Sequence, residues 1–191
     1  ALLLAVVLLR AARLEGHQMS VAPAPPIALD ETALGERLAG GIRFETITHQ
    51  DPAQLPVAQF EAFRAYLEQS YPRMHAALVR ERVAGHSLLY TWPGSESALR
   101  PLLLMAHQDV VPVEPGSEGD WSQPPFSGRI VDGVVWGRGA MDDKGSLFAI
   151  CEAVERLLAD GHVPRRTLLV AFGHDEEVGS TGAAATAALL A

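Results

Sequence analysis

Residues 166–181 read "RTLLVAFGHDEEVGST", a mostly apolar run that ends in three adjacent carboxylates. A short continuous apolar run is typical of a strand buried within a sheet. Asp175, Glu176 and Glu177 therefore stand together where this strand ends, although neighbouring negative charges repel one another. A bound cation would relieve the repulsion, and one glutamate could remain free as a base. The simpler alternative is an acidic loop that caps the following helix.

A second stretch of this kind comes earlier in the chain, in "PLLLMAHQDVVP", residues 101–112. Its apolar run predicts another buried strand, and His107 and Asp109 follow at its end. In extended backbone these two side chains share one face, so His107 could bind a metal while Asp109 orients the imidazole ring. A surface His–Asp pair is the alternative. Because ligands bind outside the carboxyl ends of parallel strands, we expect both acidic stretches at the same sheet edge.

The third polar stretch is "GRGAMDDKG", residues 137–145, in which three glycines surround Asp142, Asp143 and Lys144. Two adjacent aspartates suit a cation, since one carboxylate can bridge two metals. The stretch does not match the G-x-x-x-x-G-K-[ST] phosphate loop, which argues against a nucleotide-binding domain. A glycine-rich turn with a helix-capping aspartate remains open as the simpler interpretation.

The rest of the chain alternates helical and extended patterns, which predicts an α/β layered domain with a largely parallel sheet. A hairpin is expected to turn at Asp132–Gly133. Asp30 is expected to cap the first of the helices, and Gly40–Gly41 to end it. The expected helices cover residues 30–40, 56–69, 144–160 and 179–191, and the expected strands cover 86–92, 101–107 and 165–173.

The composition is that of a globular protein, because 48% of the 191 residues are apolar and 20% are charged. The formal net charge of −8 argues against a nucleic-acid partner, which needs a basic surface. A single cysteine, Cys151, excludes a disulfide within the chain and a thiolate zinc cluster. We expect Cys151 to be a small buried apolar residue.

The N-terminal stretch "ALLLAVVLL", followed by Arg10 and Arg13, is too short to span a bilayer. We interpret it as the remnant of a signal peptide or membrane anchor, with an ordinary buried helix as the alternative. Proline-rich residues 21–30 then predict a tether. Residues 1–29 would thus lie outside a folded domain of residues 30–191. The protein would be secreted, periplasmic or anchored facing outside, with the cytoplasm as the alternative.

Three motifs in this order, "LLLMAHQDVVPV", "WSQPPFSGRIVDGVVWGRGAMDDKGS" and "LLVAFGHDEEVGS", resemble the dinuclear-zinc exopeptidases and amidohydrolases. That family includes carboxypeptidase S, glutamate carboxypeptidase, aminoacylase and succinyl-diaminopimelate desuccinylase. The resemblance spans roughly residues 30–190 and is strongest to the carboxypeptidase S-like branch, which includes N-acyl-amino-acid hydrolases. It implies a three-layer α/β/α catalytic domain of the zinc-exopeptidase kind.

The resemblance also implies roles for single residues. His107 would bind one of two zinc ions and Glu177 the other, while Asp142 would bridge them; cobalt or manganese could replace zinc. Asp109 would orient His107, and Glu176 would be the general base. The peptide bond that follows Asp142 is often cis in this family. Other residues of the motifs are not expected to take part in the chemistry: His174, Asp175, Trp121, Pro125 and Phe126.

These roles predict hydrolysis of a peptide or N-acyl amide bond next to a free carboxylate, with a small peptide or N-acyl-amino acid as substrate. The resemblance further implies a lid domain that supports a homodimer, and two more metal ligands, beyond Ala191. The chain is therefore expected to be the N-terminal part of the enzyme and to be inactive alone. A relative that keeps the fold as a binding module is the competing hypothesis, and intact metal ligands favour the enzyme.

Overall fold

A four-stranded sheet forms the centre of the computed structural model, which describes residues 2–16 and 19–191. The strand order is β1-β2-β6-β3. Strands β1 and β2 pair antiparallel, β2 and β6 pair antiparallel, and β6 and β3 pair parallel, so these four strands form a mixed sheet. The strands are β1 (Val79–Val83), β2 (Ser87–Trp92), β3 (Leu102–His107) and β6 (Leu168–Gly173).

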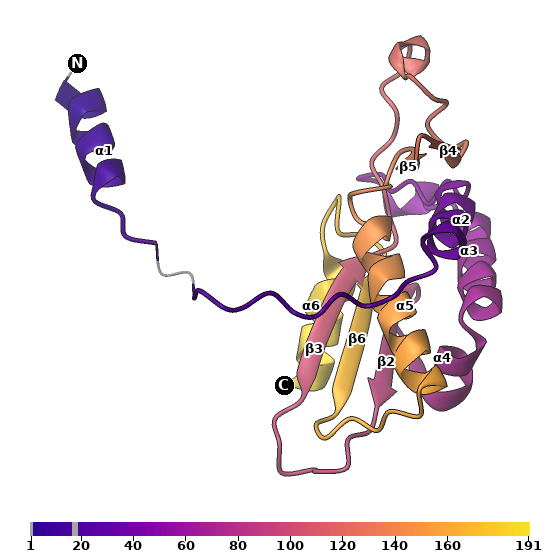
Figure 1. Cartoon of the computed structure of the whole chain (residues 1–191). Coiled ribbons are helices and arrows are strands. Elements are labelled where there is room, and N and C mark those ends of the chain that lie inside the picture. Colours follow the sequence, from indigo (N-terminus) through magenta and orange to yellow (C-terminus); the bar gives the residue numbers. More distant parts are fainter. Residues whose placement is uncertain (1, 17–18) are drawn as a thin grey trace.

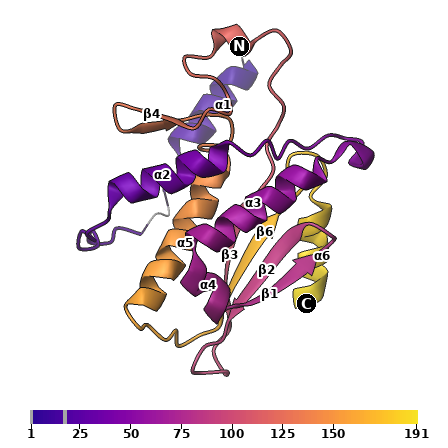
Figure 2. The ribbon, with the colours of Figure 1, turned by 90° about the vertical axis from the view of Figure 1, so that its right-hand side faces the viewer.

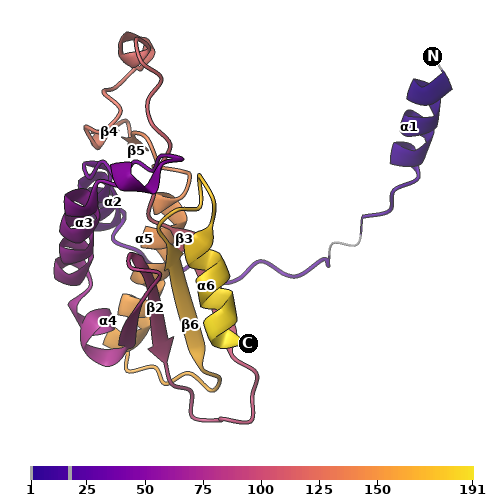
Figure 3. The same ribbon diagram turned by 180° about the vertical axis from the view of Figure 1, so that it is seen from behind.

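Helices cover both faces of this sheet and produce a three-layer α/β/α arrangement (Figure 1). Figure 3 shows helix α6 on one face and helices α2, α3, α4 and α5 on the other. The predicted α/β class is confirmed, but the sheet is mixed rather than largely parallel, because β2 runs antiparallel to both of its neighbours. Four helices of these layers are α2 (Glu31–Ile42), α3 (Val57–Ser70), α5 (Lys144–Ala159) and α6 (Thr181–Leu190). The remaining elements are α1 (Leu2–Ala12), η1 (Pro52–Gln54), α4 (Pro72–Ala77), η2 (Glu118–Asp120), β4 (Arg129–Val131) and β5 (Val134–Trp136).

The two faces of the sheet contribute to two separate apolar clusters, because successive strand side chains point to opposite sides. On the α5 side, Tyr90 and Phe172 join the main core with residues of α3, α4 and α5. On the α6 side, Leu89 and Ala171 pack with Ala185 of α6. Cys151 is 1% exposed within the main core, as its sequence context predicts. The sheet is thus held from both sides.

Helix α2 begins as predicted but ends later than predicted. The Asp30 side chain accepts a hydrogen bond from the Ala33 backbone N–H at 3.0 Å, which caps the helix. The expected stop at Gly40–Gly41 is wrong, since the helix continues to Ile42. These two glycines allow close packing instead: a Cβ atom at Gly41 would lie 2.4 Å from the Phe148 ring.

The predicted hairpin is confirmed. Strands β4 and β5 pair antiparallel, and the turn between them lies at Asp132 and Gly133 (Figure 2). Both turn residues have positive φ, 51° and 77°, as a two-residue hairpin turn of type I′ requires. The hairpin contacts α2 and continues into the glycine-rich stretch that carries Asp142.

Strand β3 was predicted to be a buried strand. In the part of the chain that the structure describes, one of its two faces is exposed instead. Leu103 is 40% exposed and Met105 57% exposed, whereas Leu104 and Ala106 pack against the main core. The reason is the position of β3 at the edge of the four-stranded sheet, while α6 packs against β6, β1 and β2. An uninterrupted apolar run therefore did not indicate burial on both sides here.

The N-terminal helix α1 lies away from the folded layers (Figure 1). It contains no buried residue, so the alternative of an ordinary buried helix is not what the structure shows. Among the described residues, no helix has both the length and the apolar character needed to cross a membrane.

We expect Gly41→Ala to destabilise the protein by about 1–3 kcal/mol, because the added methyl group would overlap the Phe148 ring. Gly35→Ala in the same helix is the matched control, since its Cβ would meet only Ile130 at 3.6 Å and Val135 at 3.9 Å. That change should stabilise the protein by about 0.5–1 kcal/mol through helix propensity. Urea unfolding of both variants checks the pair, and equal effects would contradict the close helix packing.

Candidate metal centre

The parallel pairing of β3 and β6 brings the ends of these two strands together. His107, the last residue of β3, lies opposite Gly173, the last residue of β6. The backbone N–H of Gln108 then donates to the Gly173 carbonyl at 2.8 Å, which continues the pairing one residue further. The two acidic stretches therefore leave the sheet at one edge, as the sequence predicts.

The imidazole ring of His107 is held at both nitrogens. Nδ1 lies 3.0 Å from the backbone carbonyl of Asp109 and 3.3 Å from its carboxylate. Nε2 lies 3.1 Å from Oδ1 of Asp142 and 3.9 Å from Oε2 of Glu176. With Nδ1 donating to Asp109, Nε2 is the ring nitrogen that faces the carboxylates on the other side.

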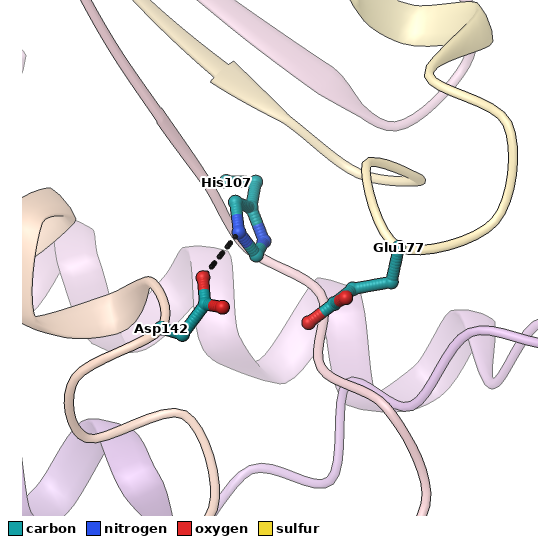
Figure 4. A group of neighbouring side chains, drawn as sticks. All are labelled: His107, Asp142 and Glu177. Atoms are coloured by element: carbon teal, nitrogen blue, oxygen red, sulfur yellow. Dashed lines mark hydrogen bonds and ion pairs between the residues drawn. The ribbon is translucent and has the colours of Figure 1, made fainter. Parts of the chain in front are cut away.

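His107, Asp142 and Glu177 converge on one region, and each offers a ligand atom within 4.8 Å of the others' (Figure 4). His107 comes from the end of β3, Asp142 from the turn before α5, and Glu177 from the turn before α6. The Asp142 side chain is 80% exposed, so the cluster is open to solvent. The peptide bond between Asp142 and Asp143 is cis, as the resemblance implies.

Asp109 is the buried partner behind this cluster, with 0% of its surface exposed. Its Oδ1 accepts from the backbone N–H of Glu176 at 3.1 Å, and its Oδ2 accepts from that of Glu177 at 3.1 Å. Thr48 donates its hydroxyl to Oδ2 at 2.8 Å. One carboxylate therefore fixes both the His107 ring and the turn that carries the two glutamates.

Lys144 lies directly after the two aspartates, but its side chain points into the protein. It is 0% exposed, and its ammonium donates to the carbonyls of Gly41 at 3.1 Å and Phe44 at 2.7 Å. Burial lowers the pKa of Lys144 to about 7. These contacts attach the aspartate turn to the end of α2. They also direct the one lysine of the stretch away from any phosphate at its surface.

Asp175, the first carboxylate of "DEE", is engaged by the protein rather than directed at the cluster. Asp175 accepts hydrogen bonds from the backbone N–H groups of Thr181 at 2.8 Å and Gly182 at 3.0 Å, and from the Thr181 hydroxyl. It therefore binds the N-terminus of α6, which is the helix-capping role that the simpler interpretation assigns to this loop. His174 is buried, and its Nδ1 lies 2.8 Å from the Ser87 hydroxyl.

The electrostatics of the cluster favour a cation among its carboxylates. Burial alone would lower the pKa of His107, but Asp109 and Asp142 outweigh burial and raise that pKa to about 9. Burial and the neighbouring Asp142, Asp109 and Glu176 raise the pKa of Glu177, against the opposing effect of His107. The pKa of Asp109 is lowered despite burial, because His107, Glu177 and Thr48 donate to its carboxylate. Positive charge is therefore stabilised here and extra negative charge is not.

The donor set fits a divalent transition metal. One imidazole nitrogen and two carboxylates, with no thiolate, suit zinc, cobalt or manganese. The Nε2 atom of His107 faces the carboxylates while Nδ1 is engaged by Asp109, which is the arrangement in which a histidine binds metal.

Residues 103–191 match peptidase family M20/M25/M40. The chain belongs to this family. Carboxypeptidase S of Saccharomyces cerevisiae is 44% identical over 163 residues, which cover 81% of this chain and 28% of the relative. N-fatty-acyl-amino acid synthase/hydrolase PM20D1 of Homo sapiens is 40% identical over 163 residues, covering 84% of this chain and 32% of the relative. The chain thus spans about 30% of the length of the curated relatives that it matches.

A solved M20 structure supports the fold. The M20 family metallo-carboxypeptidase Sso-CP2 of Sulfolobus solfataricus superposes with a TM-score of 0.61 at 22% identity, covering 82% of this chain and 33% of that one. At this identity the likeness concerns the fold alone. It agrees with the three-layer arrangement described above and with the α/β class expected from the sequence.

The sequence reasoning missed two residues that contact this candidate centre or its turns. Thr48 was not singled out, although "TIT" at 46–48 has the alternation of extended backbone, which would place two hydroxyls on one face. Lys144 was noted only as part of the glycine-rich stretch. A lysine directly after two aspartates could bind a ligand through its positive charge or anchor the turn internally, and the burial of its ammonium identifies it as an anchor.

We expect Asp175→Ala to destabilise the protein by about 1–3 kcal/mol, since it leaves the first N–H groups of α6 without an acceptor. Glu176→Gln is the neighbouring control. Its side chain is 55% exposed, so it should change stability by less than about 0.5 kcal/mol. Thermal or urea unfolding measures both, and a larger loss for Glu176→Gln would show that the two roles are assigned wrongly.

Proposed function

We propose that this chain carries the catalytic centre of a metal-dependent hydrolase that cleaves a peptide or N-acyl amide bond next to a free carboxylate. The observation that carries the proposal is the convergence of His107, Asp142 and Glu177, with Asp109 behind the imidazole. Membership of a peptidase family supports it. So do the printed activities of the relatives, one a carboxypeptidase and one an N-fatty-acyl-amino acid synthase/hydrolase.

The proposed cofactor is a pair of zinc ions, for which cobalt or manganese could substitute. His107 would hold one ion and Glu177 the other, and Asp142 would contribute to both. When bound, such ions polarise the scissile carbonyl and lower the pKa of an attacking water. The exposed Asp142 carboxylate and the partly exposed Glu177 leave the centre accessible to an ion and to a substrate.

Glu176 is proposed as the general base. Its carboxylate is 55% exposed and lies 3.9 Å from Nε2 of His107, beside the cluster rather than within it. Its backbone N–H is held by the buried Asp109 carboxylate, so the side chain extends from a fixed turn. A carboxylate in this position can take a proton from an attacking water and later give it to the leaving amine.

The N-terminal 29 residues are proposed to lie outside this catalytic domain, as a targeting or anchoring segment and a tether. Every described residue between positions 2 and 32 is exposed. Residues 30–191 contain the capped helix α2 and all of the sheet. The exposure of the residues before α2 supports this proposed boundary.

Glu176→Gln in the full-length protein should keep the metal content near normal and lower turnover of a peptide or N-acyl-amino acid by about 10²–10⁴-fold. The amide is nearly isosteric but cannot accept the proton. Turnover and elemental analysis on the same preparation check the two parts of this expectation. Metal loss equal to that of a Glu177 variant would mean that base and ligand are interchanged.

His107→Ala and Glu177→Gln should each lower metal content, because each removes a ligand atom from the cluster. His49→Ala is a matched control, since His49 is an exposed histidine on the segment next to Thr48. Elemental analysis after dialysis measures the bound ion in all three. Full occupancy in the His107 variant would contradict the ligand assignment.

A further inference from the structure

A short segment before α3 lies alongside the residues that follow β3. Ile47 and Val110 form an isolated parallel bridge. The Val110 N–H donates to the Thr46 carbonyl at 3.0 Å, and the Thr48 N–H donates to the Val110 carbonyl at 3.2 Å. This bridge places two buried threonine hydroxyls, 0% and 2% exposed, next to the segment that contains Asp109.

The two hydroxyls have different acceptors. Thr46 donates to the backbone carbonyl of Gln108 at 2.6 Å, whereas Thr48 donates to the Oδ2 atom of Asp109 at 2.8 Å. Thr48 is therefore in contact with the carboxylate that also engages His107 and the Glu176–Glu177 turn. Thr46 makes an equally buried hydrogen bond that does not touch this carboxylate.

The Asp109 carboxylate has no contact with solvent, so its orientation depends on its hydrogen-bond donors. Oδ2 has two of them, the Thr48 hydroxyl and the Glu177 N–H, and Oδ1 has the Glu176 N–H and the His107 ring. Removal of the Thr48 hydroxyl would leave Oδ2 with one donor in a dry environment. The carboxylate would then turn to regain a partner, and the imidazole and the glutamate turn would follow.

We propose that Thr48 is a positioning residue of the metal centre, acting through Asp109 on the orientation of the His107 ring and of the turn that carries Glu177. The inference rests on the proposed metal-binding role of this cluster and adds a residue to it. Outer contacts of this kind change metal affinity by about 10–100-fold when they are removed. The Thr48 hydroxyl donates to the Asp109 carboxylate, so its effect on the metal ligands would pass through that carboxylate.

Three substitutions separate positioning from simple stability. Thr48→Val removes the hydroxyl at nearly constant volume, Thr48→Ser keeps the hydroxyl, and Thr46→Val removes the matched hydrogen bond from the same segment. The probe is Co²⁺ added to the metal-free full-length protein, with affinity measured by titration and ligand geometry by the visible absorption of the bound ion. Urea unfolding of each metal-free variant records the change in stability.

Thr48→Val should bind Co²⁺ about tenfold more weakly than the wild type and show a shifted absorption spectrum at saturation. Thr48→Ser should restore both. Thr46→Val should keep the wild-type affinity and spectrum even if its stability falls as much as that of Thr48→Val. If Thr48→Val does not fold, Thr48→Ala carries the same comparison, since it removes the hydroxyl without adding volume.

Equal affinity and spectra for Thr48→Val and Thr46→Val would overturn the inference while the metal centre stands. The proposed centre itself is tested by His107→Ala in the same titration. If His107→Ala binds Co²⁺ as well as the wild type does, the cluster is not the metal site and the role of Thr48 falls with it. Weaker binding by His107→Ala and Thr48→Val, with normal binding by Thr46→Val, supports both.

Discussion

The parallel pairing between β3 and β6 is the constraint on which the candidate centre depends. Strand β2 is antiparallel to β6 and ends on the opposite side of the sheet, and β1, which runs in the same direction as β6, is separated from it by β2. Strands β3 and β6 are therefore the neighbours in this sheet whose final residues lie side by side. The register is equally important, because His107 lies opposite Gly173. That register lets the Asp109 carboxylate reach the backbone N–H groups of Glu176 and Glu177. A shift of one residue would turn the side chains of the strand to the other face.

The three adjacent carboxylates of Asp175, Glu176 and Glu177 repel one another less because each side chain has a different environment. Asp175 accepts from the first N–H groups of α6, Glu177 faces His107 and Asp142, and Glu176 remains exposed beside them. The "DDK" stretch divides its charges in the same way: the Lys144 ammonium is buried on backbone carbonyls, and the Asp142 carboxylate is 80% exposed. In both turns, one charged side chain anchors the backbone to the protein interior. That anchoring holds the remaining side chains at the cluster.

Sequence reasoning predicted the helices α2, α3, α5 and α6, the strands β2, β3 and β6, and the common edge of the two acidic stretches, because each has a strong local pattern. It missed β1, whose sequence "VRERV" is mostly charged and exposed and is a strand only because it pairs with β2. It also ended α2 at Gly40–Gly41, because it took the glycines as a stop signal. Gly41 instead allows close packing of Phe148, and no local sequence pattern contains such a tertiary contact. The contact between Thr48 and Asp109 joins residues 61 positions apart, so it too required coordinates.

The charge balance at His107 explains why the centre suits a cation rather than an anion. Its ring lies between the carboxylate of Asp109 on one side and those of Asp142 and Glu176 on the other. With a pKa raised to about 9, the imidazole carries a proton at neutral pH, and that proton supplies positive charge to the surrounding carboxylates. A metal ion bound at Nε2 would supply the same charge from the same position, so proton and metal compete for one atom. Because Nδ1 is committed to Asp109 in either case, the exchange leaves the ring in place.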